Sequence, residues 1–270
     1  MLSSRLRPHI VVSGRVGVGL AADTILHLIN LRNAGRLPDG ARIVEIGAQQ
    51  LSNSFLRATA ELAQLYELLG RVPVDLGGPR EAAILDGIER QAPSAPASQP
   101  FWESLGFTYD AVEYGGHRGV TALDLNLDHV PAKLRSSFDL VVNAGTTEHV
   151  VNQDNAFRVI HDLTKVGGIM LHELPGGGML THGVVSYNPQ FFWLLCRFNN
   201  YDVFDLTIAH AGDAPVSSDV VQSNTQFARS RHALRVPLTV PIFVVTAMLQ
   251  KQSDQPYVTP LDVPAEALPT

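Results

Sequence analysis

The sequence predicts an α/β protein with a doubly wound, Rossmann-like, mostly parallel seven-stranded sheet and an antiparallel last strand. Three observations support this. Helix-like and strand-like segments alternate up to about residue 174, as in parallel strands joined by crossover helices. Segment 137–145, SFDLVVNAG, is continuously apolar, as a central parallel strand covered on both faces should be. Two strand-like segments then close the chain without an obvious helix between them, which indicates an antiparallel pair.

Each expected element has a local signal. The expected strands, short apolar segments with many β-branched residues, are 41–47, 108–113, 119–125, 137–145, 166–174, 201–210 and 240–251. The expected helices are the second half of 16–34, with Asp23 or Thr24 as cap, then 52–70, 152–164 and a helix that starts after Asn188. Apolar residues recur in them at helical spacing, and Pro189 suits a first helical position.

The chain divides into three parts by composition. We expect an N-terminal helical extension over 1–40, a main domain over 41–250 and a loose C-terminal tail over 251–270. Segment 71–100 is rich in Pro, Gly, Ala and Ser, and we interpret it as an insertion or lid with one short helix at 80–90. The motif GRVGVG at 14–19 has the wrong spacing for a nucleotide-binding loop, so we interpret it as an entry to the first helix.

Composition excludes several classes of function. The 270 residues are 45% hydrophobic, enough for a sizeable core, and the net charge of −6 without a basic cluster argues against nucleic-acid binding. The single cysteine, Cys196, excludes an intramolecular disulfide framework and makes a cysteine zinc site improbable. No apolar run reaches the roughly 20 residues that span a bilayer. We therefore expect a cytoplasmic protein without a membrane partner; a homodimer is compatible with the sequence.

Polar residues follow the expected strands at their carboxyl ends, where ligands bind in open α/β sheets. These residues are Glu45-Ile46-Gly47-Ala48-Gln49, Glu113, Asp124-Leu125-Asn126, Asn143-Ala144-Gly145, Glu148-His149, His172-Glu173 and, after a glycine-rich loop, His182. A carboxylate such as that of Glu113 can accept both hydroxyls of a ribose. The loop at Gly47 lacks the Gly-x-Gly-x-x-Gly of dinucleotide sites, which favours a nucleoside ligand without a pyrophosphate.

Three histidines, His149, His172 and His182, follow the fourth and fifth strands. A histidine beside a carboxylate such as Glu148 or Glu173 can act as a general base. A second hypothesis is a metal site made of the three histidines and a carboxylate, but no compact metal-binding pattern is present and no metal is assigned. The third is that these histidines only hydrogen-bond within their loops. His161 lies in the middle of a helix, and we interpret it as structural.

Several segments together resemble class I S-adenosylmethionine-dependent methyltransferases. They are VEIGA (44–48), ALDLN (122–126), FDLVVNAGTTEHV (138–150) and LTKVGGIMLHELP (163–175). Segment HGVVSYNPQFFWLL (182–195), with NNY (199–201), is similar to a subgroup of bacterial methyltransferase domains. The resemblance covers residues 41–201 and implies a seven-stranded sheet with a reversed last hairpin. The chain departs from the family loop, because Ala48 and Gln49 replace the later glycines.

The resemblance also implies roles for matched residues. Those lining the methionine part of S-adenosylmethionine would be Glu45, Gly47, Ala48 and Gln49. Glu113 would hold the ribose hydroxyls, Asp124 and Leu125 would flank the adenine, and Asn143 and Ala144 would face the sulfonium. The expected catalytic group comprises His149 and His182 as alternative bases, with Glu148 and His172 beside them.

The sequence therefore predicts an enzyme that transfers a methyl group from S-adenosylmethionine to an oxygen or nitrogen of a polar small molecule. One alternative is a nicotinamide-dependent oxidoreductase or epimerase on a related sheet, against which the single glycine of the first loop argues. Another is a non-catalytic binding module that keeps a degenerate cofactor pocket. Fold alone does not separate these functions.

Overall fold

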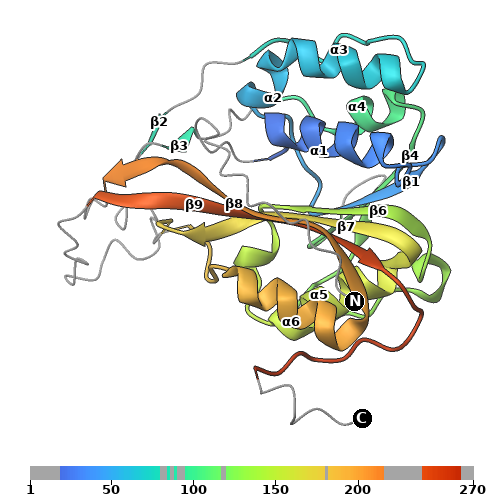
Figure 1. The fold of residues 1–270 in the computed structure, drawn as a ribbon, viewed down its shortest axis with the longest axis vertical. Helices are drawn as coiled ribbons and strands as arrows, with labels where there is room; N and C mark the ends of the chain where they lie inside the picture. The colour runs from blue at the N-terminus through green and yellow to red at the C-terminus, as the bar shows by residue number, and fades with distance from the viewer. Residues whose placement is uncertain are drawn as a thin grey trace.

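The computed structural model describes residues 19–79, 84–85, 88–89, 95–116, 120–179, 182–215 and 239–262. Its centre is a seven-stranded sheet in the order β5-β4-β1-β6-β7-β9-β8 (Figure 1). The strands are β1 (Arg42–Ile46), β4 (Thr108–Glu113), β5 (Thr121–Ala122), β6 (Phe138–Ala144), β7 (Thr164–Gly177), β8 (Tyr201–Pro215) and β9 (Thr239–Lys251). Strand β9 runs antiparallel to both neighbours, so the predicted sheet with its antiparallel last strand is confirmed. Strand β9 lies between β7 and β8, and β8 is the edge strand.

Helices cover both faces of this sheet (Figure 1). On one face lie α1 (Ala22–Asn33), α2 (Asn53–Arg57), α3 (Thr59–Leu68) and α4 (Gln99–Ser104), and on the other lie α5 (Gln153–Leu163) and α6 (Pro189–Asn199). Each layer buries its own hydrophobic core. Phe55 and Trp102 belong to the core under α1–α4, whereas Phe157 and Phe192 belong to the core under α5 and α6. The sheet is therefore apolar on both faces, which explains its continuous apolar strands.

Helix starts follow the capping signals of the sequence in two cases. The side chain of Asn152 accepts a hydrogen bond from Asn155 N at the start of α5. The side chain of Asn188 accepts one from Phe191 N, and Pro189 is the first residue of α6, as predicted. The start of α1 differs, since Ala21 precedes the helix and neither predicted cap residue occupies that position.

The segment between β1 and β4 differs from its prediction. The expected helix 52–70 is two helices, α2 and α3, because Ala58 between them leaves the helical region at φ −79° and ψ 52°. The expected helix at 80–90 is wrong where the structure describes that segment. Strands β2 (Ile84–Leu85) and β3 (Ile88–Glu89) pair there as an antiparallel hairpin. The unpredicted helix α4 comes next and packs Phe101 and Trp102 into the core. Residues 14–18 of the GRVGVG motif lie outside the described residues.

The C-terminal segment is expected to be loose, but residues 251–259 pack against α5 and α6. The Asn199 side-chain amide donates to Val258 O and accepts from Val258 N, and the Tyr257 side chain is only 7% exposed. The buried Lys251 ammonium donates to the carbonyls of His161 and Thr164. Burial of the apolar Tyr257 ring stabilises the packing of this segment against the two helices. Residues 263–270 of the expected tail lie outside the described residues.

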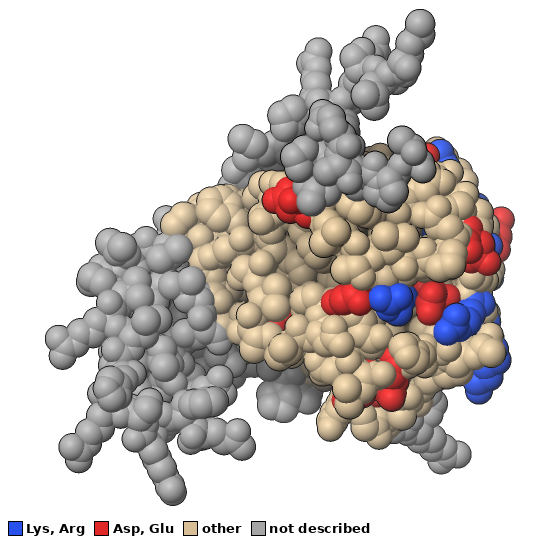
Figure 2. All heavy atoms as spheres, turned by 90° about the horizontal axis from the view of Figure 1, so that it is seen from below, with Lys and Arg blue, Asp and Glu red and all other residues tan. Residues whose placement is uncertain are grey.

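The described surface has mixed charge. On the face drawn in Figure 2, acidic and basic side chains lie side by side toward one end, and uncharged residues cover much of the rest. Neighbouring charges of opposite sign give weaker fields than a patch of one sign. Among the described helices, none combines the length and apolarity needed to cross a membrane.

Candidate functional site

The carboxyl ends of β1, β4, β6 and β7 meet at one edge of the sheet, because these strands are parallel neighbours. Glu45 of β1 is fully buried there, and its carboxylate accepts four hydrogen bonds. The donors are Gln49 N (2.8 Å), Ser98 Oγ (2.8 Å), Tyr109 OH (2.8 Å) and Trp102 Nε1 (2.7 Å). Burial raises the pKa of Glu45, and these hydrogen bonds lower it. Glu45 therefore fixes the loop after β1 onto α4 and β4.

The loop after β1 turns tightly at Gly47, whose φ is +75°. A Cβ at this position would lie 2.5 Å from Thr146 Oγ1 in the loop after β6, so glycine is required. The Gln49 side-chain amide donates to Gly47 O (3.0 Å) and lies 3.1 Å from Thr146 Oγ1. Gln49 thus joins the two loops at the switch point of the sheet, between β1 and β6.

Glu113 ends β4 beside this turn and is partly exposed. Its Oε2 accepts from Ala48 N (3.1 Å) and its Oε1 from Tyr114 N (3.1 Å). A carboxylate has about four acceptor positions, so Glu113 retains capacity for a ligand. Asp124 follows β5, the neighbour of β4, and accepts from Asn126 N, while Leu125 is 9% exposed. Two predicted contact residues, Glu113 and Asp124, thus follow adjacent strands.

Asn143 and Ala144 end β6 and are both buried. The Asn143 amide donates to Thr147 Oγ1 (2.9 Å) and lies 3.2 Å from His172 Nδ1. His172 is 1% exposed, and its ring packs 5.4 Å from the rings of both Phe157 and Phe192. Burial lowers the pKa of His172 to about 3, so this ring stays neutral near pH 7.

Glu148 lies at the centre of a second group of side chains. It belongs to a 3₁₀ turn, η2 (Thr147–His149), and is 1% exposed. Its Oε1 lies 3.3 Å from His182 Nε2 and 3.8 Å from His149 Nε2, while the two imidazole rings pack 4.9 Å apart. We call Glu148, His149 and His182 the Glu148 cluster. The structure therefore brings together three of the four predicted catalytic residues, and His172 lies outside the cluster.

The Glu148 cluster can accept a proton. Partial burial lowers the pKa of His149, the Glu148 charge raises it and a charge on His182 lowers it again. Half of the His149 side chain is exposed, so a ligand can reach its ring. A neutral imidazole beside a carboxylate has the arrangement of a general base.

Sequence reasoning missed a buried pair on the other face of β7. Glu173 accepts a hydrogen bond from Thr24 Oγ1 of α1 (2.9 Å), and its Oε1 lies 3.5 Å from His27 Nε2. Burial raises the pKa of Glu173 to about 7 and lowers that of His27. Adjacent strand residues point to opposite faces, so the alternation of β7 could have placed His172 and Glu173 apart.

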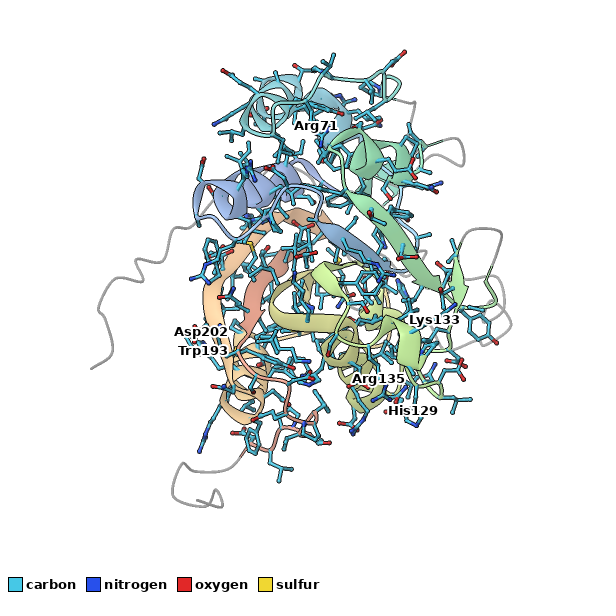
Figure 3. The ribbon with its side chains drawn as sticks, turned by 90° about the vertical axis from the view of Figure 1, so that its right-hand side faces the viewer. Arg71, His129, Lys133, Arg135, Trp193 and Asp202 are labelled. Atoms are coloured by element: carbon cyan, nitrogen blue, oxygen red, sulfur yellow. The ribbon has the colours of Figure 1, made fainter. Side chains whose placement is uncertain are left out.

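A cavity of about 460 Å³ lies at the opposite edge of the sheet, where β6 and β7 begin. His129 and Arg135 line it, and Figure 3 labels both. Two of its cations already have acidic partners, Arg135 with Asp162 and Arg158 with Asp154. This cavity is therefore separate from the strand ends that carry the predicted site residues.

The strand order, with β9 reversed between β7 and β8, is the sheet that the sequence resemblance implies. In the family that the sequence resembles, the resemblance implies a cofactor site where β1, β4, β5 and β6 end. The residues described above occupy that edge.

The chain matches known proteins in structure only. No family model and no curated protein sequence matches the chain. Among solved structures it is similar to a putative methyltransferase from Bacillus halodurans, with 8% identity over 86% of this chain and 100% of that one at a TM-score of 0.44. It is also similar to an S-adenosylmethionine-dependent methyltransferase from Archaeoglobus fulgidus, with 12% identity over 83% and 93% of the chains and a TM-score of 0.37. At such values these likenesses identify neither a substrate nor a catalytic group.

Proposed function

We propose that the chain binds S-adenosylmethionine at the carboxyl ends of β1, β4, β5 and β6 and transfers its methyl group to an oxygen or nitrogen of a polar small molecule. The observation that carries this proposal is Glu113. It ends the second strand of the nucleoside-binding half, beside Gly47, with acceptor capacity left over. A charged carboxylate in that place suits the two ribose hydroxyls.

The other strand ends fit the remaining parts of the cofactor in this proposal. Asp124 and Leu125 would flank the adenine, since β5 lies next to β4. Gly47, Ala48 and Gln49 would line the methionine part, and Glu45 would act by holding that loop in place. Asn143 and Ala144 end β6, the neighbour of β1 on its other side, where the sulfonium would lie.

Methyl transfer is an in-line displacement, so positioning and exclusion of water supply most of the catalysis. A hydroxyl or protonated amine acceptor must also lose a proton. We assign this step to the Glu148 cluster, in which His149 or His182 would accept the proton and Glu148 would orient the ring. Because His172 is buried between two phenylalanines with a pKa of about 3, its part in this proposal is to pack and to hold Asn143.

Calorimetric titration tests the cofactor assignment. We expect the protein to bind S-adenosylmethionine and S-adenosylhomocysteine and not a nicotinamide dinucleotide. Glu113→Gln should weaken binding about 10- to 100-fold, because hydrogen bonds to a charged group contribute about 1.5–3 kcal/mol. Glu67→Gln is the matched control, since Glu67 is an exposed acid on α3.

Two results would contradict the assignment. One is the absence of any binding of either adenosyl ligand by the folded protein. The other is equal affinity of Glu113→Gln and the Glu67→Gln control. The proton-transfer role has its own check, once a screen of hydroxyl and amine acceptors has given turnover: if His149→Ala and His182→Ala both keep full turnover, these histidines are not the base.

A further inference from the structure

We propose that the Glu148 cluster binds one divalent transition-metal ion of the zinc class. One carboxylate oxygen of Glu148 and one ring nitrogen each of His149 and His182 lie within 4.8 Å of one another. Two imidazoles and a carboxylate are a ligand set for Zn²⁺ and Fe²⁺ that leaves coordination positions open. The proposal stands on these three side chains and not on the cofactor assignment.

The distances are close to those that a bound ion needs. Glu148 Oε1 lies 3.3 Å from His182 Nε2 and 3.8 Å from His149 Nε2. Ligand bonds of about 2.0–2.2 Å place neighbouring ligand atoms about 3–3.5 Å apart. His182 therefore already has a suitable separation from Glu148, and the half-exposed His149 ring needs only a small movement to reach the same ion.

The burial of Glu148 supports a cation at this place. The side chain is 1% exposed, and its Oε2 has no hydrogen-bond partner among the described residues. A buried carboxylate with an unpaired oxygen is unfavourable unless a positive charge lies nearby. A divalent ion bound by Glu148 and the two imidazoles would supply that charge.

The backbone around the cluster holds the two loops together. Val184 N (2.7 Å) and Val185 N (3.1 Å) both donate to the carbonyl of Glu148. Gly183 has φ +73°, and a Cβ there would lie 2.8 Å from Glu148 Cγ. The segment after His182 thus packs directly on the Glu148 side chain. This contact fixes a histidine from the loop after β7 beside the Glu-His pair that follows β6.

This ligand set differs from the metal hypothesis that the sequence suggests, which also includes His172. That ring packs between Phe157 and Phe192, and its Nδ1 lies beside the Asn143 amide. The three-residue site therefore keeps open positions for an oxygen ligand such as a hydroxyl or carboxylate of an acceptor. A bound ion would occupy one ring nitrogen each of His149 and His182, so these rings could act as a general base only in the metal-free protein.

The test measures metal binding by the tag-free full-length protein after dialysis against a chelator. We expect one equivalent of Zn²⁺ to bind in competition with a chromophoric chelator, and Co²⁺ to give visible absorption bands of an imidazole and carboxylate site. Glu148→Gln, His149→Ala and His182→Ala should each weaken Zn²⁺ binding by more than about tenfold. His129→Ala is the control, because His129 is an exposed histidine at the opposite edge of the sheet (Figure 3).

Folding of the variants is followed in parallel by thermal unfolding with and without Zn²⁺. Only proteins that bind the ion should gain thermal stability from it. Glu148→Gln keeps the size of the buried side chain, so it tests the charge even if the alanine variants unfold. The proposal is overturned if the wild-type protein does not bind Zn²⁺ or Co²⁺. It is also overturned if all three ligand variants bind them as His129→Ala does.

Titration of S-adenosylhomocysteine in chelator and in Zn²⁺ separates this inference from the proposed function. Zn²⁺ binding without nucleoside binding would remove the methyltransferase proposal and leave the metal site. Nucleoside binding without Zn²⁺ binding would remove the metal site and leave the histidines available as bases.

Discussion

At the scale of single residues, Gln49 marks the clearest departure from the loop of the family that the sequence resembles. Its amide nitrogen is held by Gly47 O and Thr146 Oγ1. Among the described residues, none donates a hydrogen bond to its Oε1, so this oxygen is available to a ligand. A carbonyl oxygen held in this way can accept from the amino group of a methionine moiety. Gln49 therefore combines a structural bond with a free acceptor where the family has glycine.

We predict that Gln49→Ala weakens S-adenosylhomocysteine binding about 5- to 10-fold, because one neutral hydrogen bond contributes about 1 kcal/mol. Calorimetry gives the affinity, and Gln64→Ala on the exposed side of α3 is the matched control. Tighter binding by Gln49→Ala would contradict this role. It would mean that the Gln49 side chain fills space that the ligand needs.

Single residues also show the limit of prediction from sequence. Glu45 stands in the predicted place, but the sequence does not reveal that Ser98, Trp102 and Tyr109 occupy its carboxylate. Ser98 immediately precedes α4, Trp102 lies in α4 and Tyr109 in β4, all more than fifty positions away along the chain. Contacts of such separation depend on tertiary packing, which local patterns do not record.

At the scale of elements, α1 and β7 are joined by the buried group of Thr24, His27 and Glu173. Burial raises the pKa of Glu173 from 4.5 to about 7. Between these values the folded protein holds a proton that the unfolded chain has released. The Glu173 contribution to stability is therefore complete below about pH 4.5 and is lost as the pH rises through 7.

We predict that Glu173→Gln removes this loss, since glutamine does not titrate and can still accept from Thr24. The variant should match the wild type near pH 4.5 and exceed its free energy of unfolding by about 3 kcal/mol above pH 8. Urea unfolding from pH 5 to 9 measures the difference from the wild type. The Glu67→Gln control keeps Glu173, so its difference from the wild type should not change with pH. A constant difference across this range would show that Glu173 does not titrate there.

Elements with strong local signals are predicted well. Strand β6 has a continuous apolar sequence, and α5 and α6 each start after an asparagine cap. The insertion before β4 is predicted poorly, because Pro-rich and Gly-rich composition indicates a break in regular structure without specifying the next element. Helix α4 is short and owes its place to Phe101 and Trp102, which fill the core beside Phe55.

At the scale of the whole molecule, the candidate ligand site and the C-terminal segment lie at opposite ends of the parallel strands. Glu113 and the Glu148 cluster lie at the carboxyl ends of these strands, and the chain after β9 packs at the opposite ends. At those opposite ends Lys251 binds the carbonyls of His161 and Thr164, and Tyr257 packs against His161 and Arg158. Changes there should therefore affect stability without affecting the ligand site.

We predict that Tyr257→Ala lowers the free energy of unfolding by about 3 kcal/mol, the usual cost of removing a buried aromatic ring. At low urea the folded variant should bind S-adenosylhomocysteine with wild-type affinity, because its ring lies at the edge opposite Glu113. Val258→Ala is the control: Val258 is 43% exposed, and its replacement should change stability by less than about 0.5 kcal/mol. Urea unfolding and calorimetry on the same samples measure both quantities. A loss of affinity in the folded Tyr257→Ala variant would show that the two edges are coupled through the sheet.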